Sequence, residues 1–138
     1  GGKTPIGRCL DQDRFKDFAT IDQPETRAVF NPGGTNERFA RQHLQHAQFI
    51  IFPDNRFIFQ ELMAGRADVM FTDEIEVALK TQQHRPLCAL MPGQRLTYQE
   101  KAIWLHKDDA LKQYIDDWLK TIIADGSLKA LFDDALGR

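Results

Sequence analysis

The stretch TRAVFNPGGTNERFARQHLQHAQFIIFP, residues Thr26–Pro53, carries the pattern that decides the fold. It opens with a short run of β-forming residues that stops at Pro32 and the two glycines after it. From Asn36 to about His46, apolar residues fall on one side of a predicted helix. The run QFIIFP that follows has the length and apolar character of a buried strand. A strand, a helix and a strand with short connections predict a parallel β-α-β unit.

The same alternation continues through the next part of the chain. A helix is predicted over about Arg56–Ala64, closed by Gly65, and a strand follows at ADVMFT. DEIEVALKTQQ is typical of a helix, and PLCALMP is a further strand candidate. This order predicts an α/β fold with a doubly wound, mostly parallel sheet. Ligands of such folds bind at the carboxyl ends of the strands, where NPGGTNE and FTDE stand.

The last third of the chain has a different character. EKAIWLHK is predicted to be a strand, and ALKQYIDDWLKTIIADG an amphipathic helix that ends at Gly126. A second helix is predicted over SLKALFDDAL, with Ser127 as its N-cap. Trp104 and Trp118 are interpreted as core residues.

The composition is that of an ordinary soluble globular domain. The 138 residues are 42% hydrophobic and 28% charged, with a net charge of −2. This charge gives no reason to expect a nucleic acid or an anionic membrane as partner. No apolar run approaches the roughly 20 residues of a membrane span. The start GGKTPIGRC lacks Met, so we expect a processed chain or a fragment, and a missing signal peptide says nothing about compartment.

The two cysteines, Cys9 and Cys88, lie far apart in the sequence and form no CxxC pair. They are either two buried thiols or a disulfide between neighbouring strands, and the residues alone leave both open. A disulfide would indicate an oxidising compartment. Closing a loop of roughly 80 residues would stabilise the fold by about 4 kcal/mol on the chain-entropy model.

The turn before the first long helix is the first candidate binding feature. Gly33-Gly34-Thr35 presents free backbone N–H groups and the positive end of a helix dipole, which favours a carboxylate or phosphate. The Thr35 hydroxyl is an added donor. The spaced Gly-Lys-Ser/Thr of a P-loop is absent. The alternative is that Thr35 is only an N-cap.

Several titratable residues have both a structural and a functional interpretation. Glu37 in the first helical turn either supports the helix dipole or, with a raised pKa in a closing cleft, donates a proton. Asp73 either caps its own helix or contacts a ligand's ammonium or hydroxyl. The spacing of His43 and His46 suits a metal, but no third ligand stands nearby, so we predict solvated histidines and no metal site.

Taken together, GRADVMFTDEIEVA and the last 39 residues, from EKAIWLHK to the end, resemble the type II periplasmic solute-binding proteins. The stretches GGKTPIGRC, NPGGTNERFAR, GRADVMFTDEIE, LCAL and EKA are most similar to an enzyme branch of that family, the cyclohexadienyl dehydratases. The resemblance implies two lobes joined by a double hinge that close on a ligand. Residues 1–95 would form the second lobe. The strand and helices of 96–138 would complete the first lobe, most of which is absent together with its carboxylate-binding arginine.

The resemblance also implies a reaction and residues that carry it. Enzymes of this branch convert prephenate to phenylpyruvate, or arogenate to phenylalanine, with loss of water and CO2 and without a cofactor. Gly34, Thr35 and Asn36 would hold substrate carboxylates, and Glu37 would be the general acid that protonates the departing hydroxyl.

Further residues acquire roles from the same resemblance. Asp73 matches the position that holds the ligand's ammonium in amino-acid-binding relatives. Lys3 and Lys101 lie near the predicted lobe junction, where they either face the cleft or are solvated. The periplasmic context of the family favours a disulfide between Cys9 and Cys88.

Two other functions share this fold. The main alternative is a non-catalytic binding protein that delivers amino acids or other small acids to an ABC transporter. A ligand-sensing receptor domain is a third. In each case the expected partner is a small carboxylate ligand. Because the chain would supply only one wall of the cleft, and closure between two lobes completes the site, we expect this chain alone to be inactive. The apolar helix face after residue 110 predicts a homodimer or a domain-swapped oligomer.

Overall fold

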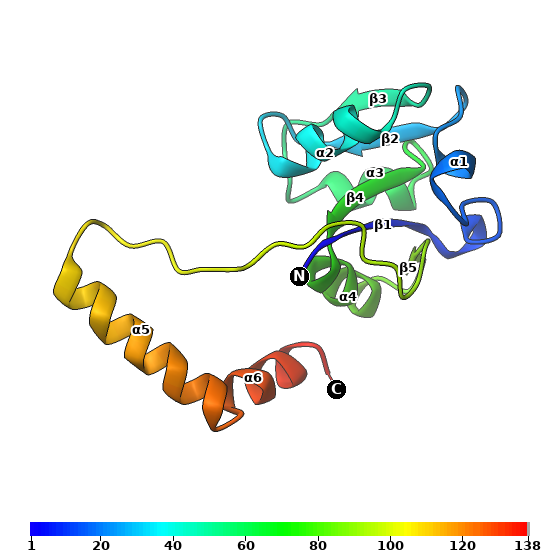
Figure 1. Cartoon of the computed structure of the whole chain (residues 1–138). Helices are drawn as coiled ribbons and strands as arrows, with labels where there is room; N and C mark the ends of the chain where they lie inside the picture. The colour runs from blue at the N-terminus through cyan, green and yellow to red at the C-terminus, as the bar shows by residue number, and fades with distance from the viewer. Residues whose placement is uncertain (138) are drawn as a thin grey trace. The chain divides into compact units, whose positions relative to one another are not determined.

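A computed structural model describes residues 1–137 of the chain. These residues form two compact units, Gly1–Gln99 and the residues from Glu100 onward (Figure 1). The first unit contains a five-stranded sheet in the order β3-β2-β4-β1-β5. Its strands are β1 (Lys3–Arg8), β2 (Arg27–Phe30), β3 (Gln48–Ile51), β4 (Val69–Asp73) and β5 (Leu87–Ala89). Its helices are η1 (Cys9–Asp11), α1 (Phe18–Ile21), α2 (Thr35–His43), α3 (Ile58–Met63) and α4 (Glu74–Gln83).

Four of the five strands run in the same direction, as the sequence predicts, although two of the four strand pairings are antiparallel. Strand β2 pairs in parallel with both β3 and β4, so the carboxyl ends of these strands lie at one edge of the sheet. Strand β1 is the exception, because it runs antiparallel to its neighbours β4 and β5. Its register places Lys3 opposite Asp73. The antiparallel strand therefore carries a lysine to the edge at which ligands bind in α/β folds.

Helices cover both faces of this sheet, which makes the unit a three-layer α/β structure (Figure 1). Neighbouring strand residues point to opposite faces, so Phe30 and Val29 belong to different cores. One core joins the sheet to α2 and its neighbours through Phe15, Ile21, Ala28, Phe30, Phe39, Ala40, Leu44, Val69 and Phe71. The other joins the sheet to α3 and α4 through Ile6, Val29, Ile58, Phe59, Leu62, Met70, Val77 and Leu87.

Cys9 and Cys88 form a disulfide, which decides between the two alternatives left open by the sequence. Cys9 directly follows β1 and Cys88 lies in β5, and their Cα atoms are 4.7 Å apart. The antiparallel pairing of β1 with β5 brings these two positions together across 79 residues of sequence. The bond ties the edge strand of the sheet to its neighbour.

The second unit consists of α5 (Asp109–Ala124) and α6 (Ser127–Ala135), preceded by a segment without regular structure. The strand predicted at EKAIWLHK, residues 100–107, is therefore wrong. A strand needs a neighbour for its backbone hydrogen bonds, and this segment pairs with no strand in the described part of the chain. The core assignment of the two tryptophans is also wrong, since Trp104 is 96% and Trp118 45% exposed.

The start of α6 differs from the prediction by one residue. Gly126 occupies the N-cap position with φ of 81°, a left-handed conformation that glycine adopts without steric cost, and Ser127 is the first helical residue. Among the described residues, no helix combines the length and apolar character needed to cross a membrane.

Candidate ligand-binding site

The candidate site lies at the carboxyl ends of β2 and β4, where a buried lysine joins three predicted site residues. Lys3 Nζ donates hydrogen bonds to Thr35 Oγ1 at 3.0 Å, to Asn36 Oδ1, and to Asp73 Oδ1 at 2.8 Å. Only 2% of Lys3 is exposed. The four residues come from β1, the first turn of α2 and the end of β4. Segments up to 70 residues apart in sequence therefore meet at one point.

The contacts of Lys3 match the donors of an ammonium group. Three different acceptors surround Nζ, and an ammonium group has three N–H donors. One of the acceptors is the carboxylate of Asp73, so the pair is a charge-assisted contact. Burial of a charged lysine is costly unless it is paired and hydrogen-bonded, and both conditions are met here.

The helix mouth next to this cluster presents donors toward a ligand. Gly34 is the N-cap of α2 and lacks a side chain that could cap it, so the alternative interpretation of Thr35 as the N-cap is wrong. Within the described residues, no acceptor contacts the N–H groups of Thr35 and Asn36. Because Thr35 Oγ1 accepts from Lys3, its hydroxyl proton remains available to a ligand. Two backbone donors, one hydroxyl and the helix dipole thus favour a carboxylate at this point.

Glu37 does not face an apolar environment in this structure. One carboxylate oxygen accepts from Gly33 N at 2.6 Å, and the other pairs with Arg41 Nε at 2.8 Å. The hydrogen bond from the Gly33 amide and that from Arg41 hold the pKa of Glu37 below its ordinary value. The raised pKa expected for a proton donor is therefore wrong for this conformation, because both neighbours stabilise the ionised carboxylate.

Asp73 stands at the N-cap position of α4, but its side chain does not cap that helix. Its carboxylate pairs instead with Lys3. The structural interpretation of Asp73 as a simple cap therefore does not hold. A carboxylate at the end of β4 is held at the candidate site by a lysine that the register of β1 places opposite it.

Two residues that were not predicted from the sequence, Thr72 and Glu76, fix the orientation of Asn36. Asn36 Nδ2 donates to Thr72 Oγ1 at 3.3 Å, and the Thr72 hydroxyl in turn donates to Glu76. Thr72 is 1% exposed. With its amide nitrogen held by Thr72, Asn36 directs its oxygen at Lys3. The position of Thr72, one residue before Asp73 at the end of a predicted strand, is the signal that could have identified it.

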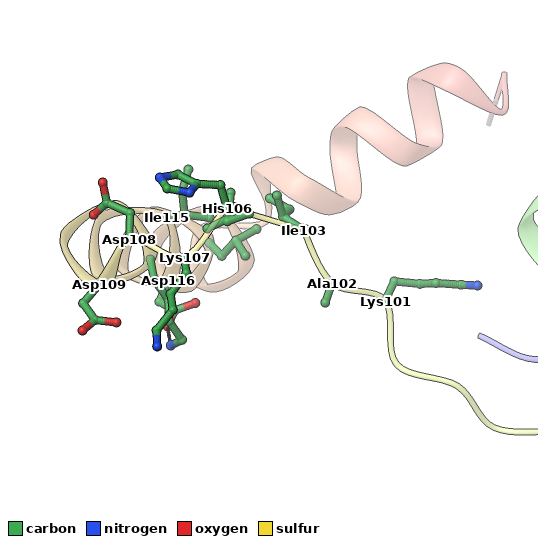
Figure 2. Close-up of a pocket in the computed structure, with 12 residues that line it drawn as sticks. Lys101, Ala102, Ile103, His106, Lys107, Asp108, Asp109, Ile115 and Asp116 are labelled. Atoms are coloured by element: carbon green, nitrogen blue, oxygen red, sulfur yellow. Dashed lines mark hydrogen bonds and ion pairs between the residues drawn. The ribbon is translucent and has the colours of Figure 1, made fainter.

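Lys101 belongs to the second unit. It lines a pocket of about 420 Å³ between the segment 101–107 and the first turns of α5 (Figure 2). Figure 2 shows that positively charged lysine and negatively charged aspartate side chains border this pocket. Asp108 caps α5 through Leu111 N, and Lys112 pairs with Asp116, so these three charged groups are engaged in local contacts of the helix.

The two histidines of α2 and the following loop have separate partners. His43 stacks on Phe39 with ring centroids 4.1 Å apart, and His46 Nδ1 lies 3.1 Å from Asp22 Oδ2. In the described part of the chain, no three His, Cys, Asp or Glu side chains come together in a way that could hold a metal ion.

Comparison with known proteins adds information that the geometry alone lacks. No family model matches the chain. Over 128 residues, 93% of the chain, it is 46% identical to a protein of Pseudomonas aeruginosa named cyclohexadienyl dehydratase. The match spans 48% of that relative, so the chain corresponds to about half of its length.

Solved structures of other proteins are also similar to this chain over nearly its whole length. The crystal structure of an ancestral cyclohexadienyl dehydratase is 38% identical, with a TM-score of 0.66 over 99% of this chain and 57% of the other. An amino-acid ABC transporter substrate-binding protein of Streptococcus pneumoniae, bound to L-arginine, has a TM-score of 0.81 with the same coverage. Its identity of 18% shows a common fold alone. By sequence, this chain is similar to part of the cyclohexadienyl dehydratases, and its fold is that of the corresponding part of amino-acid-binding transport proteins.

Proposed function

We propose that this chain is the substrate-binding half of a dehydratase that converts prephenate to phenylpyruvate, arogenate to phenylalanine, or both. The observation that carries the proposal is the 46% identity to the cyclohexadienyl dehydratase of P. aeruginosa over nearly the whole chain. The helix mouth supports it, because the free donors of Thr35 and Asn36 suit the carboxylates of either substrate.

In this reaction the bond from the ring to its carboxylate breaks and CO2 leaves. The electron pair of that bond enters the ring, and the bond from the opposite ring carbon to its hydroxyl breaks. The departing oxygen takes one proton and leaves as water. Gly34, Thr35 and Asn36 hold a carboxylate of the substrate, and Glu37 supplies the proton. Such general acid help is typically worth about 10²–10⁴-fold in rate.

Glu37 must gain a proton before it can donate one. A substrate carboxylate bound at the neighbouring N–H groups places a second negative charge close to Glu37, and like charge raises the pKa of a carboxyl group. Closure of a second lobe excludes water and acts in the same direction. In our proposal the contacts of Glu37 with Gly33 and Arg41 belong to the state without substrate.

We also propose a periplasmic location. The family is one of periplasmic binding proteins, and the bond between Cys9 and Cys88 forms and persists in an oxidising compartment.

The test is phenylpyruvate formation from prephenate by a two-lobed protein that contains this segment. We expect turnover by the two-lobed protein, a loss of about 10²–10⁴-fold for Glu37→Gln with prephenate binding retained, and no turnover by the 138-residue chain alone. Glu25→Gln, which changes an exposed glutamate, is the matched control. An unchanged rate for Glu37→Gln would contradict the acid assignment. A folded two-lobed protein that binds small acids without turnover would instead indicate a transport-binding protein.

A further inference from the structure

We propose that the first unit has a second binding site, which takes a zwitterionic amino acid with an aliphatic side chain. The site is a pocket between α4 and the turn that follows β5, on the face of the sheet that α4 covers. Its volume is about 470 Å³, within the roughly 300–1,000 Å³ of small-ligand pockets. The inference goes beyond the proposed function and does not depend on it.

One wall of the pocket is a single face of α4. Glu74, Val77, Ala78 and Thr81 line it, and their spacing of three and four residues makes them neighbours on the helix surface. The Thr81 hydroxyl donates to Ala78 O at 3.1 Å, so it is already satisfied. The middle of this wall is therefore apolar, and its only charged group is Glu74 at the start of the helix.

The opposite wall is the segment after β5, and the backbone holds it in place. Gln94 N–H donates to Met91 O at 3.1 Å, and Leu96 N–H donates to Lys3 O at 2.9 Å. The stem of Arg95 packs over Gly2, where an added Cβ would lie 2.5 Å from Arg95 Cγ. Glycine at this position therefore lets Arg95 lie at the rim of the pocket.

The pocket also contains a polar group without a partner. Thr4 lies opposite Thr72 in the antiparallel pairing of β1 with β4, and residues opposite one another share a face of the sheet. Because the Thr72 hydroxyl donates to Glu76 of α4, the Thr4 side chain also lies on the α4 face. Thr4 is 6% exposed and lines the pocket. Among the described residues its hydroxyl makes no hydrogen bond, yet it is not sealed from solvent, so it opens into the pocket.

The rim carries one positive and one negative group, which together define the ligand. Arg95 Nε donates to Glu74 Oε2 at 2.8 Å, and the two side chains are 50% and 34% exposed. This contact uses one of five guanidinium N–H donors and one of two carboxylate oxygens, so both groups can bind a ligand as well. A lone carboxylate would meet the like charge of Glu74, and a lone ammonium that of Arg95. A ligand that carries both groups side by side gives each charge its opposite.

An α-amino acid meets these requirements. Its carboxylate binds the remaining donors of Arg95. Its ammonium binds Glu74 and the Thr4 hydroxyl, which lie near one another because Glu74 N–H donates to Gly2 O at the start of β1. Its side chain packs on the small apolar residues of the lining, Val77, Ala78 and Ala89, and an aliphatic side chain suits such a surface.

The test compares three probes that share one aliphatic body. L-leucine carries both charged groups, 4-methylpentanoate lacks the ammonium, and 3-methylbutan-1-amine lacks the carboxylate. Each is titrated into the 138-residue chain, and the amide NMR signals of Val77, Ala78 and Ala89 report binding at the pocket. The signals of Thr35 and Asn36 report the helix mouth of α2 separately.

We expect L-leucine to bind about tenfold more tightly than either other probe, because each of those leaves one charge of the rim without its opposite. Arg95→Gln should weaken L-leucine by about tenfold and spare 3-methylbutan-1-amine. Glu74→Gln should weaken L-leucine to a similar extent and spare 4-methylpentanoate. Arg56→Gln removes an exposed arginine that also pairs with a carboxylate, that of Asp54, and should bind all three probes as the wild type does.

Thr4→Val separates a binding role of the hydroxyl from a structural one. The variant should weaken L-leucine several-fold without lowering the urea midpoint of unfolding, because the hydroxyl has no partner in the free chain that the substitution could remove. A threonine with only a structural role would show the reverse, a lower midpoint with unchanged binding.

Four results would overturn the inference. These are no saturable shift at Val77, Ala78 and Ala89 with L-leucine, equal binding of the three probes, charge variants that keep the wild-type preference, and that reverse pattern for Thr4→Val. Shifts by L-leucine confined to Thr35 and Asn36 are a case of the first, since they show binding at the helix mouth alone. None of these results bears on turnover of prephenate by the two-lobed protein, so the proposed function is judged independently.

Discussion

The two units of this chain have helices of similar design but different surroundings. In the Gly1–Gln99 unit, α2 buries Phe39 and Ala40 against the sheet. In the second unit, neither α5 nor α6 has a buried residue, although both carry apolar side chains on one face. An amphipathic pattern predicts a helix in both cases. Burial requires a partner surface as well, and within the described residues only the first unit supplies one.

This comparison predicts different responses to mutation in the two units. Both tryptophans of the chain, Trp104 and Trp118, lie in the second unit, so tryptophan fluorescence reports that unit alone. Amide signals of β4 report the first unit.

The largest effect is expected at Asp68, which is 3% exposed and pairs with Arg27 at 2.8 Å and Arg8 at 3.3 Å. Burial by itself raises the pKa of Asp68, but the hydrogen bonds from the Arg27 side chain and backbone lower it overall. Asp68→Ala leaves these arginines without their carboxylate and should cost about 3–5 kcal/mol of unfolding free energy. Urea unfolding followed at the β4 amides measures this.

Asp117→Ala in the second unit is the matched control, because this carboxylate is 58% exposed. It should change the first unit's stability by less than about 0.5 kcal/mol. Equal effects of the two substitutions would mean that the buried ion pairs contribute no more than surface charges.

A similar contrast is expected for apolar side chains. Leu62 of α3 is fully buried in the core between this helix and the sheet. Leu62→Ala should lower the free energy of unfolding by about 2–5 kcal/mol, because packing is lost and a cavity forms. Ile123 in α5 is 62% exposed, so Ile123→Ala should change the free energy of unfolding little. Thermal unfolding of both variants, read at the β4 amides, tests the contrast. A marked loss for Ile123→Ala would show that α5 stabilises the first unit.

The disulfide should affect the first unit alone. Cys9→Ser/Cys88→Ser opens a loop of 79 residues and should lower the unfolding free energy by about 2–4 kcal/mol. The fluorescence signal of the second unit should not change, since both cysteines lie in the first. A fluorescence change on reduction of the wild-type bond would show that the two units unfold together.

Acid should weaken the first unit through Asp22. Burial tends to raise the pKa of this carboxyl group, but hydrogen bonds from the backbone N–H groups of Gln45, His46 and Ala47 lower it from 3.8 to about 2. Because the folded-state pKa is depressed, the stabilisation is complete above pH 5 and is lost as the pH falls through 3.8 toward 2. The shift corresponds to about 2 kcal/mol at most, and partial solvent exposure reduces it.

Asp22→Asn separates this contribution from that of other carboxylates. The variant should be less stable at pH 6 and should lose less stability than the wild type between pH 5 and pH 2. Parallel pH profiles for the two proteins, measured by urea unfolding, would contradict the assignment to Asp22.

The smallest effect concerns association through the second unit. Tyr114, Trp118 and Phe132 are 70%, 45% and 44% exposed. We expect this apolar face to bring copies of the chain together weakly, as a homodimer or a swapped oligomer. Sedimentation should show a concentration-dependent mass that Trp118→Glu reduces. Gln113→Glu adds the same charge at an exposed position of α5 and is the control. A strictly monomeric wild type would contradict the prediction.

The sequence by itself determined the order of helices and strands of the first unit from residue 26 onward, and the position of the helix mouth. The spacing of apolar residues sets whether a segment is a helix or a strand, and the Pro and Gly residues of NPGGTNE set where α2 begins. These are local properties, because each depends on residues within one or two turns of one another. The boundaries of α4, α5 and α6 were predicted to within about two residues for the same reason.

Tertiary structure decided everything that depends on which segments meet. The antiparallel placement of β1 brings Lys3 to Asp73 and Cys9 to Cys88, and nothing local to either residue specifies that pairing. The pKa of Glu37 follows from the side-chain rotamer that reaches Gly33 and Arg41. The strand predicted at 100–107 did not form because its residues found no strand to pair with in the described part of the chain. Backbone hydrogen bonds, ion pairs and burial all need a second surface, and only the fold supplies it.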